Sequence, residues 1–210
     1  MGITVRLYRP NGTEVNVGPD GILGTLDDAP GGMLTNADGY YIFRNLPAGD
    51  YYVQVNTPAG MTSSTPNAGD PDTDIDDKDD NGSIVAGATV RSENVTLGPN
   101  GTEPQNELDL QLPVGQGGAD DHSNMTVDFG FFAPLSLGDY VWNDLDGDGL
   151  QDADEPGIQN VTMQLFLADG TTPATDVNGN PVASVTTNAN GLYTFTNLPP
   201  GDYIVRATTP

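Results

Sequence analysis

The chain of 210 residues contains no cysteine, a single histidine and only six lysine and arginine residues. Without cysteine, neither a disulfide, a thiolate metal site nor a cysteine nucleophile is possible. One histidine leaves no zinc site of the usual kind, because such sites combine several histidine and cysteine ligands. A serine–histidine–aspartate triad would have to use His122, and no nucleophile motif lies near it. These absences argue against an enzyme.

Positive charge is scarce, since the six basic residues face 30 acidic ones and the formal net charge is −24. A chain this acidic is repelled by nucleic acid and by anionic lipid surfaces. The sequence also contains no run of about 18 apolar residues, so we expect no transmembrane helix. Nucleic-acid binding and membrane insertion are therefore not expected, and cations are the expected partners of the acidic clusters.

Among the residues that are present, the segment DLDGDGLQDADE (144–155) matches the EF-hand calcium loop. Gly149 occupies the sharp turn, and the ligand positions hold Asp144, Asp146, Asp148, Leu150 through its carbonyl, Asp152 and Glu155. Calcium is a hard cation that takes six to eight oxygen ligands, which alternate carboxylates on a tight loop can supply. The flanking segments 135–142 and 161–167 alternate apolar and polar residues as strands do, so we expect a calcium loop between two strands.

Two further acidic segments are candidate metal sites. In GDPDTDIDDKDDNG (69–82), Asp72, Asp74 and Asp76 alternate, and Asp128 from a neighbouring element would complete the ligand shell. The alternative is a solvated acidic loop. The segment 18–29 is a third candidate, with Asp20, Asp27 and Asp28 around a glycine-rich turn, and its alternative is the acidic tip of a hairpin.

The chain contains an internal repeat. Residues 35–58 and 187–210 are identical at 15 of 24 positions, and residues 3–15 resemble residues 161–173. Such similarity indicates tandem domains. We expect a first repeat over 1–134 that lacks its opening strand and calcium loop, and the N-terminal part of a second over 135–210. The chain would then be a window in a longer array.

Turn signals separate short alternating segments throughout, and no stretch holds a helical period. The fold class expected is all-β, with tandem Ig-like or prealbumin-like sandwiches and calcium-binding loops. The predicted strands are 3–9, 39–44, 50–57, 88–97, 106–112, 125–132, 136–142, 161–167, 182–187, 192–196 and 202–209.

These motifs carry a family resemblance. LGDYVWNDLDGDGLQDADEPGIQNVTMQLF, TTNANGLYTFTNLPPGDYIVRATTP and the closing segment MTVDFGFF resemble the B-type repeats of bacterial serine-aspartate-repeat surface adhesins, the SdrD B-like family. The resemblance implies calcium-dependent Ig-like modules that act as rigid extracellular spacers. It implies a calcium site at 144–155 and a second near 70–80. The insertion at 18–32 departs from the family.

The function expected is therefore a secreted or cell-surface structural repeat: a calcium-stiffened stalk, filament or array whose neighbouring copies adjoin head to tail. Calcium at the domain junctions, with Pro134 in a short linker, would favour a stiff rod. The alternative is an adhesin or accessory module that binds a host or matrix protein or a glycan, which an exposed aromatic or apolar patch would indicate. Sequons for glycosylation occur at Asn11, Asn81, Asn94, Asn100, Asn124 and Asn160.

Overall fold

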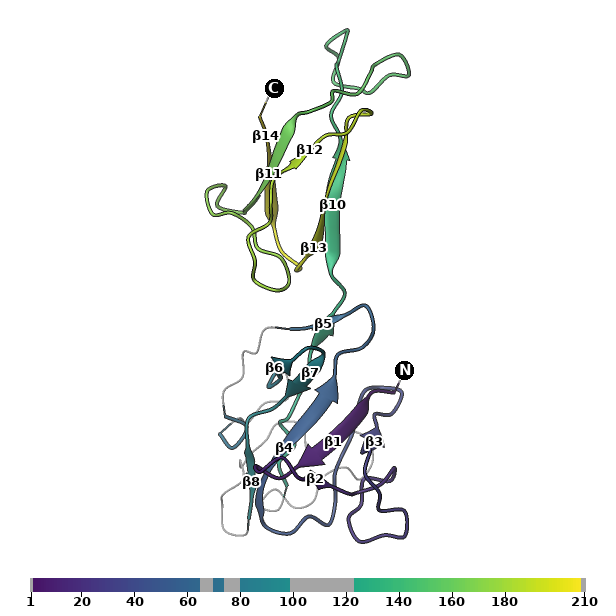
Figure 1. The fold of residues 1–210 in the computed structure, drawn as a ribbon, viewed down its shortest axis with the longest axis vertical. Coiled ribbons are helices and arrows are strands. Elements are labelled where there is room, and N and C mark those ends of the chain that lie inside the picture. The colour runs from purple at the N-terminus through teal and green to yellow at the C-terminus, as the bar shows by residue number, and fades with distance from the viewer. Residues whose placement is uncertain (1, 65–69, 74–79, 99–122, 209–210) are drawn as a thin grey trace. The chain divides into compact units, whose positions relative to one another are not determined.

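The computed structural model describes residues 2–64, 70–73, 80–98 and 123–208 (Figure 1). The chain divides into two compact units, with unit 1 at Met1–Phe132 and unit 2 at Ala133–Pro210. Every described regular element is a strand, so the prediction of an all-β fold is confirmed. No helix that could span a membrane occurs among the described residues. The Asp74 and Asp76 candidates, Asn100 and the predicted strand 106–112 lie outside them.

Unit 1 is built around a sheet in the order β2-β1-β4-β7-β6, in which β3 also pairs with β1 and β8 also pairs with β4. β5 and β9 form a separate two-stranded pair. All pairs are antiparallel, and β4 is the longest strand. The strands are β1 (Thr4–Tyr8), β2 (Glu14–Val15), β3 (Met33–Leu34), β4 (Gly49–Asn56), β5 (Thr62–Ser63), β6 (Ser83–Ala86), β7 (Thr89–Arg91), β8 (Val95–Leu97) and β9 (Phe131–Phe132).

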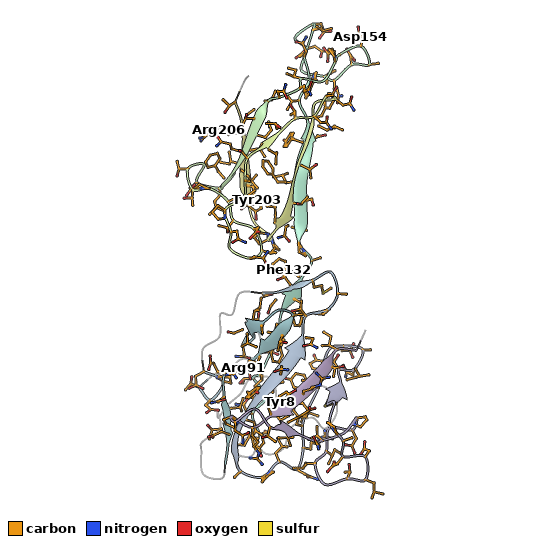
Figure 2. The ribbon with its side chains drawn as sticks, viewed as in Figure 1. Tyr8, Arg91, Phe132, Asp154, Tyr203 and Arg206 are labelled. Atoms are coloured by element: carbon orange, nitrogen blue, oxygen red, sulfur yellow. The ribbon has the colours of Figure 1, made fainter. Side chains whose placement is uncertain are left out.

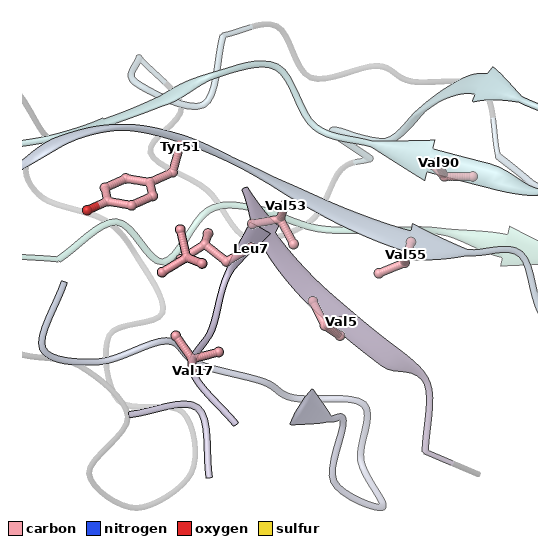
Figure 3. Close-up of a cluster of buried hydrophobic side chains, with 8 residues drawn as sticks. Val5, Leu7, Val17, Tyr51, Val53, Val55 and Val90 are labelled. Atoms are coloured by element: carbon pink, nitrogen blue, oxygen red, sulfur yellow. The ribbon is translucent and has the colours of Figure 1, made fainter. Parts of the chain in front are cut away.

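The core of unit 1 lies on one face of this sheet because apolar residues occupy alternate positions of its strands. Val5 and Leu7 of β1 and Val53 and Val55 of β4 are all at most 5% exposed. Figure 3 shows these side chains together with Tyr51 of β4, Val90 of β7 and Val17.

Unit 2 contains two small sheets, β12-β11-β14 and β10-β13. Its core packs between them and includes Met163 and Leu165 of β11 and Phe195 and Leu198 of β13. The strands are β10 (Leu135–Tyr140), β11 (Thr162–Leu167), β12 (Val185–Thr186), β13 (Leu192–Leu198) and β14 (Tyr203–Thr208).

Three strand predictions in unit 1 are corrected by the structure. Residues 39–44 form no strand and contribute one isolated bridge, Ile22 with Arg44. The predicted strand 88–97 is interrupted, because the Ser92 hydroxyl accepts a hydrogen bond from the Val53 amide and takes part in the ladder itself. Within 125–132, only β9 is a strand. Side chains of other segments bind part of the remaining backbone, because the Tyr41 hydroxyl donates to the Val127 carbonyl and the Asn81 side chain accepts from the Asp128 amide. The short strands β2, β3, β5 and β6 were not predicted.

Candidate metal centre

The acidic loop 144–155 extends from the end of β10 and is closed at its base. The Asn143 amide donates to the Pro156 carbonyl over 3.0 Å, and Trp142 and Gly157 form a β-bridge. A Cβ on Gly157 would collide with the carbonyl of Asn190. The base of the loop therefore packs directly against the turn that precedes β13, and this contact fixes the direction in which the loop extends. Figure 2 labels Asp154 in this loop.

Three carboxylates of the loop converge. Asp144, Asp146 and Asp148 each offer an oxygen, and these oxygens lie within 4.8 Å of one another. Hydrogen bonds hold the arrangement, because Asp144 accepts from the amides of Gly147 and Gly149 over 2.7 and 3.0 Å. Both glycines have φ near +77°, a conformation that other residues rarely adopt. The loop therefore directs alternate acidic side chains toward one point.

Glu155 connects the two ends of the loop. It is only 6% exposed, and its Oε1 accepts a hydrogen bond from the Leu145 amide over 2.6 Å. Its Oε2 accepts from the Asp152 amide over 3.1 Å. Asp152 and Glu155 do not join the converging trio. Leu150 exposes 65% of its surface, which suits a residue whose predicted contribution is its backbone carbonyl.

The donor set fits calcium. All five predicted side-chain donors are carboxylates, and oxygen is the donor that a hard divalent cation prefers. Three exposed carboxylates held this close repel one another, and a divalent cation between them removes that repulsion. The loop lies at the end of β10 away from Leu135, where the chain enters unit 2. The expectation that it would lie beside the linker at Pro134 is therefore wrong, because the whole of β10 intervenes.

The second acidic segment is anchored at both ends to residues 124–128. On one side, the Pro71 carbonyl accepts hydrogen bonds from Asn124 and Thr126. On the other, Asn81 bonds to the backbone of Asp128 through both its amide and its side-chain oxygen. Asp72 uses its carboxylate to accept from the Thr96 amide over 2.7 Å. Of the predicted ligands of this site, the structure thus places Asp128 beside the end of the segment and Asp72 beside β8.

Asp80 is an acidic residue of this region that the sequence reasoning did not single out. It is only 5% exposed, and burial raises the pKa of its carboxyl against the opposing effect of hydrogen bonds from the Gly82 and Gly130 backbone. The adjacent Asn81 binds the backbone of Asp128, so Asp80 is the sequence neighbour of the residue that holds this distant segment. The only sequence signal was the position of Asp80 at the end of the aspartate run, directly before an Asn-Gly turn.

The third candidate, the insertion at 18–29, brings its aspartates around a threonine. The Thr25 hydroxyl contacts Asp27 Oδ1 at 2.6 Å and Asp20 Oδ2 at 3.2 Å. Asp28 accepts from the Gly24 amide over 2.8 Å. The Thr25 hydrogen bond lowers the pKa of Asp27. These carboxylates cap a turn, and among the described residues only the trio of loop 144–155 forms a metal-like acidic group.

The glycosylation sequons differ in accessibility. Asn11, Asn94 and Asn160 are exposed. Asn81 is only 4% exposed, and the Asn124 side-chain amide donates to the Pro71 carbonyl. The first three positions are accessible from solvent, whereas Asn81 and Asn124 would have to release their contacts before a glycan could be attached. Glycosylation itself stays a prediction.

Comparison with known families extends over most of the chain. The profile described as the SdrD B-like domain matches residues 1–109 and 135–210. Serine-aspartate repeat-containing protein I of Staphylococcus saprophyticus is 38% identical over 178 residues, which are 84% of this chain and 8% of that protein. Serine-aspartate repeat-containing protein D of Staphylococcus aureus strain Newman is 35% identical over 182 residues, 86% of this chain and 11% of that protein. The chain thus spans about a tenth of the length of these relatives.

A search of solved structures finds BcpA, the major pilin subunit of Bacillus cereus. The alignment covers 99% of this chain and 83% of that chain, with a TM-score of 0.28 and 11% sequence identity. At that level of similarity the match carries no argument about fold or function.

Proposed function

Because the chain belongs to the SdrD B-like domain family, we propose that it is a segment of an extracellular structural repeat protein stiffened by calcium. Its role is that of a stalk, filament or cell-surface array in which such repeats follow one another. The resemblance to serine-aspartate-repeat surface adhesins and the scarcity of catalytic residue types support this role over an enzyme. Neighbouring repeats of the same kind are its proposed partners.

The observation that carries the proposal is the geometry of loop 144–155. Asp144, Asp146 and Asp148 are directed to one point, while Glu155 bonds to both ends of the loop. A bound calcium ion would fix these residues relative to β10 and to the turn before β13. Since the loop lies at the far end of β10, calcium would stiffen that end of unit 2 rather than the linker at Pro134.

A second calcium ion is proposed where residues 70–82 meet residues 124–128. Asp72 and Asp128 are the described members of the predicted site, and buried Asp80 is added to them. The hydrogen bonds at Pro71 and Asn81 already hold both ends of the acidic segment against residues 124–128. A cation there would stabilise the ionised form of Asp80, whose pKa is raised by burial.

The alternative, a module that binds a glycan or a partner protein, lacks a specific supporting observation. All six phenylalanines, all eight tyrosines and Trp142 are at least partly buried. Glycan binding commonly uses flat exposed aromatic rings, and none is presented here. The spacer role is therefore the better supported of the two.

Calcium titration of the full chain tests the proposal. Trp142 is the only tryptophan and lies two residues before Asp144, so its fluorescence should report binding in the loop. We expect saturation at roughly 0.1–1 mM, the range of extracellular modules. Asp148→Asn removes one ligand charge but keeps an oxygen for the Leu150 amide. It should weaken binding at least about tenfold, as disturbed ligand shells do.

The matched control is Asp154→Asn. Asp154 lies in the same loop, is exposed and occupies no ligand position, so it changes the net charge equally. Limited proteolysis in calcium and in EDTA completes the test. Calcium-dependent resistance that Asp148→Asn abolishes and Asp154→Asn retains supports the proposal. Equal cleavage of the unaltered chain in both conditions would contradict a stiffening role.

A further inference from the structure

The main sheet of unit 1 carries a row of basic side chains on its outer face, opposite the core. Arg6 of β1, Gln54 of β4 and Arg91 of β7 lie directly opposite one another in register. Ser83 of β6 continues this row, so none of its four positions is a carboxylate. Two of the six basic residues of a chain with net charge −24 thus share one row of one sheet. Figure 2 labels Arg91 and Tyr8 on this sheet.

Aromatic rings orient this basic row. The Arg91 guanidinium lies 4.5 Å from the centre of the Tyr52 ring, and Tyr52 stacks on Tyr8 with ring centroids 5.2 Å apart. An arginine above an aromatic ring is held by the electrons of the ring and keeps its positive charge. No described ion pair involves Arg91, and the Nε of Arg6 lies 3.9 Å from Glu14 at the edge of the face. The row therefore stays positive and has the partly exposed Tyr8 ring beside it.

The insertion at 18–29 presents a surface of the opposite kind. Leu26 at its tip is fully exposed, and the adjacent Asp27 and Asp28 are exposed as well. The tip is fixed against the start of the insertion, because a Cβ on Gly18 would collide with the Asp27 carbonyl. An apolar side chain and two carboxylates are thus held at one exposed point of unit 1.

Charge complementarity identifies a second copy of the chain as the partner of the basic row. At about 0.15 M ionic strength, charges more than about 8 Å apart are largely screened, so the residues near a contact decide between attraction and repulsion. Acidic surfaces of two copies repel each other over most of the chain, whereas the basic row attracts them. Arg6 and Arg91 lie two strands apart, which is about 10 Å at the usual strand spacing. The adjacent carboxylates of Asp27 and Asp28 fit between them.

We propose that the basic row of one copy binds the insertion tip, residues 26–28, of a second copy. Asp27 and Asp28 face the two arginines of the row, and Leu26 packs against the ring of Tyr8. The contact joins separate chains laterally, and it therefore goes beyond the head-to-tail order of repeats within one chain. It requires no calcium, so its failure would leave the proposed calcium site untouched.

Sedimentation equilibrium of the full chain in EDTA tests this contact, because calcium is then excluded as a cause of association. Arg91→Glu places a carboxylate opposite the acidic tip, and Asp27→Lys places a cation opposite the basic row. Each variant should self-associate at least about tenfold more weakly, since like charges in contact oppose binding. An equimolar mixture of the two variants should recover the association, because each reversed surface then meets one of opposite charge. Recovery would also show that both variants are folded.

Arg206→Glu and Asp38→Lys are the matched controls. Arg206 also lies over an aromatic ring, 4.4 Å from the centre of Phe166, but it belongs to unit 2 and lies opposite Gln164. Asp38 is exposed and lies in unit 1 outside the insertion. Both controls should leave the association unchanged.

Four outcomes would overturn the proposal. The first is an unaltered chain that stays monomeric at every concentration, and the second is a mixture that associates no better than either variant alone. The third is a control variant that weakens association as much as Arg91→Glu. The fourth is a monomeric chain that binds a poly-aspartate peptide through Arg91, which would assign the basic row to a different acidic partner.

Discussion

Units 1 and 2 share the same repeated segments but bury different parts of them. In unit 1, Val53 and Val55 of β4 are at most 5% exposed, whereas their counterparts in β14 are more open. In unit 2, Phe195 of β13 is 2% exposed, whereas its counterpart Phe43 is only partly buried. The covering strands explain this difference, because β7 and β8 pair with β4, and β10 pairs with β13. Burial in this repeat is thus decided by the neighbouring strands as much as by the strand itself.

Removing an equivalent aromatic ring from each unit should give the largest difference. Phe195→Ala should destabilise unit 2 by about 3–5 kcal/mol, the usual cost of deleting a buried phenylalanine. Phe43→Ala should cost unit 1 clearly less, because a partly exposed ring leaves a smaller cavity. Phe43 and Phe195 each make an edge contact with the tyrosine two residues earlier in the sequence. The two variants therefore lose the same kind of aromatic contact.

Denaturant unfolding followed by Trp142 fluorescence reports the change in unit 2, and hydrogen exchange of β4 reports the change in unit 1. If Phe195→Ala and Phe43→Ala lowered the free energy of unfolding of their units equally, β10 would contribute little to the burial of Phe195.

Two glycines occupy equivalent positions of the repeat, Gly39 in unit 1 and Gly191 directly before β13 in unit 2. Substituting each of them extends the comparison of the two units to a turn. Gly39 and Gly191 both have positive φ, at +96° and +81°. Around Gly39 a Cβ would meet nothing, whereas on Gly191 it would collide with the Val141 carbonyl. Gly39→Ala should therefore cost about 1–2 kcal/mol from backbone strain alone. Gly191→Ala should cost a further 1–3 kcal/mol or so from overpacking.

Trp142 fluorescence during unfolding reports the effect of Gly191→Ala, and hydrogen exchange of β4 reports the effect of Gly39→Ala. Because Gly191 packs against Gly157 at the base of the acidic loop, Gly191→Ala should also weaken calcium binding, and Gly39→Ala should not. A Gly191 variant with unchanged calcium affinity would indicate that the loop is independent of the turn beneath it.

The sequence predicted best what depends on local pattern. The alternation in 161–167 and 202–209 gave β11 and β14, and the spacing of Asp144, Asp146 and Asp148 gave their convergence, because a tight loop with glycine turns fixes it locally. The ion itself remains a proposal.

Features that depend on distant partners were not predictable in the same way. Residues 39–44 alternate like a strand, yet only their counterpart in unit 2 pairs with one. Ser92 interrupts a predicted strand because its hydroxyl meets Val53 of β4. The surroundings of buried Asp80 include the backbone of Gly130, which lies 50 residues away in the sequence. A single sequence contains no local signal for such pairings.

A smaller effect should be equal in the two units. The Tyr51 hydroxyl donates to the Pro47 carbonyl, and the Tyr203 hydroxyl donates to the Pro199 carbonyl. Each bond spans the same turn before β4 or β14. Tyr51→Phe and Tyr203→Phe should each cost about 1 kcal/mol, the usual net value of one hydrogen bond. A much larger loss at Tyr51 in unfolding experiments would show that the strands around β4 change the value of the bond.

The smallest expected effect concerns acid and arises only in unit 2. Asp169 accepts hydrogen bonds from the Thr172 side chain and the amides of Thr172 and Thr171, and these lower its pKa from 3.8 to about 2. Its counterpart in unit 1 is Asn11, which accepts from the Thr13 amide and does not titrate.

A carboxyl whose pKa is lower in the folded state adds stability above its unfolded pKa and loses that contribution as the pH falls. Unit 2 should therefore lose a small contribution between about pH 3.8 and pH 2 that Asp169→Asn removes from the profile. Unfolding of both proteins across this range, in calcium-free buffer so that calcium ligands do not contribute differently, gives the comparison. Parallel profiles would show that solvent screens the exposed carboxyl fully.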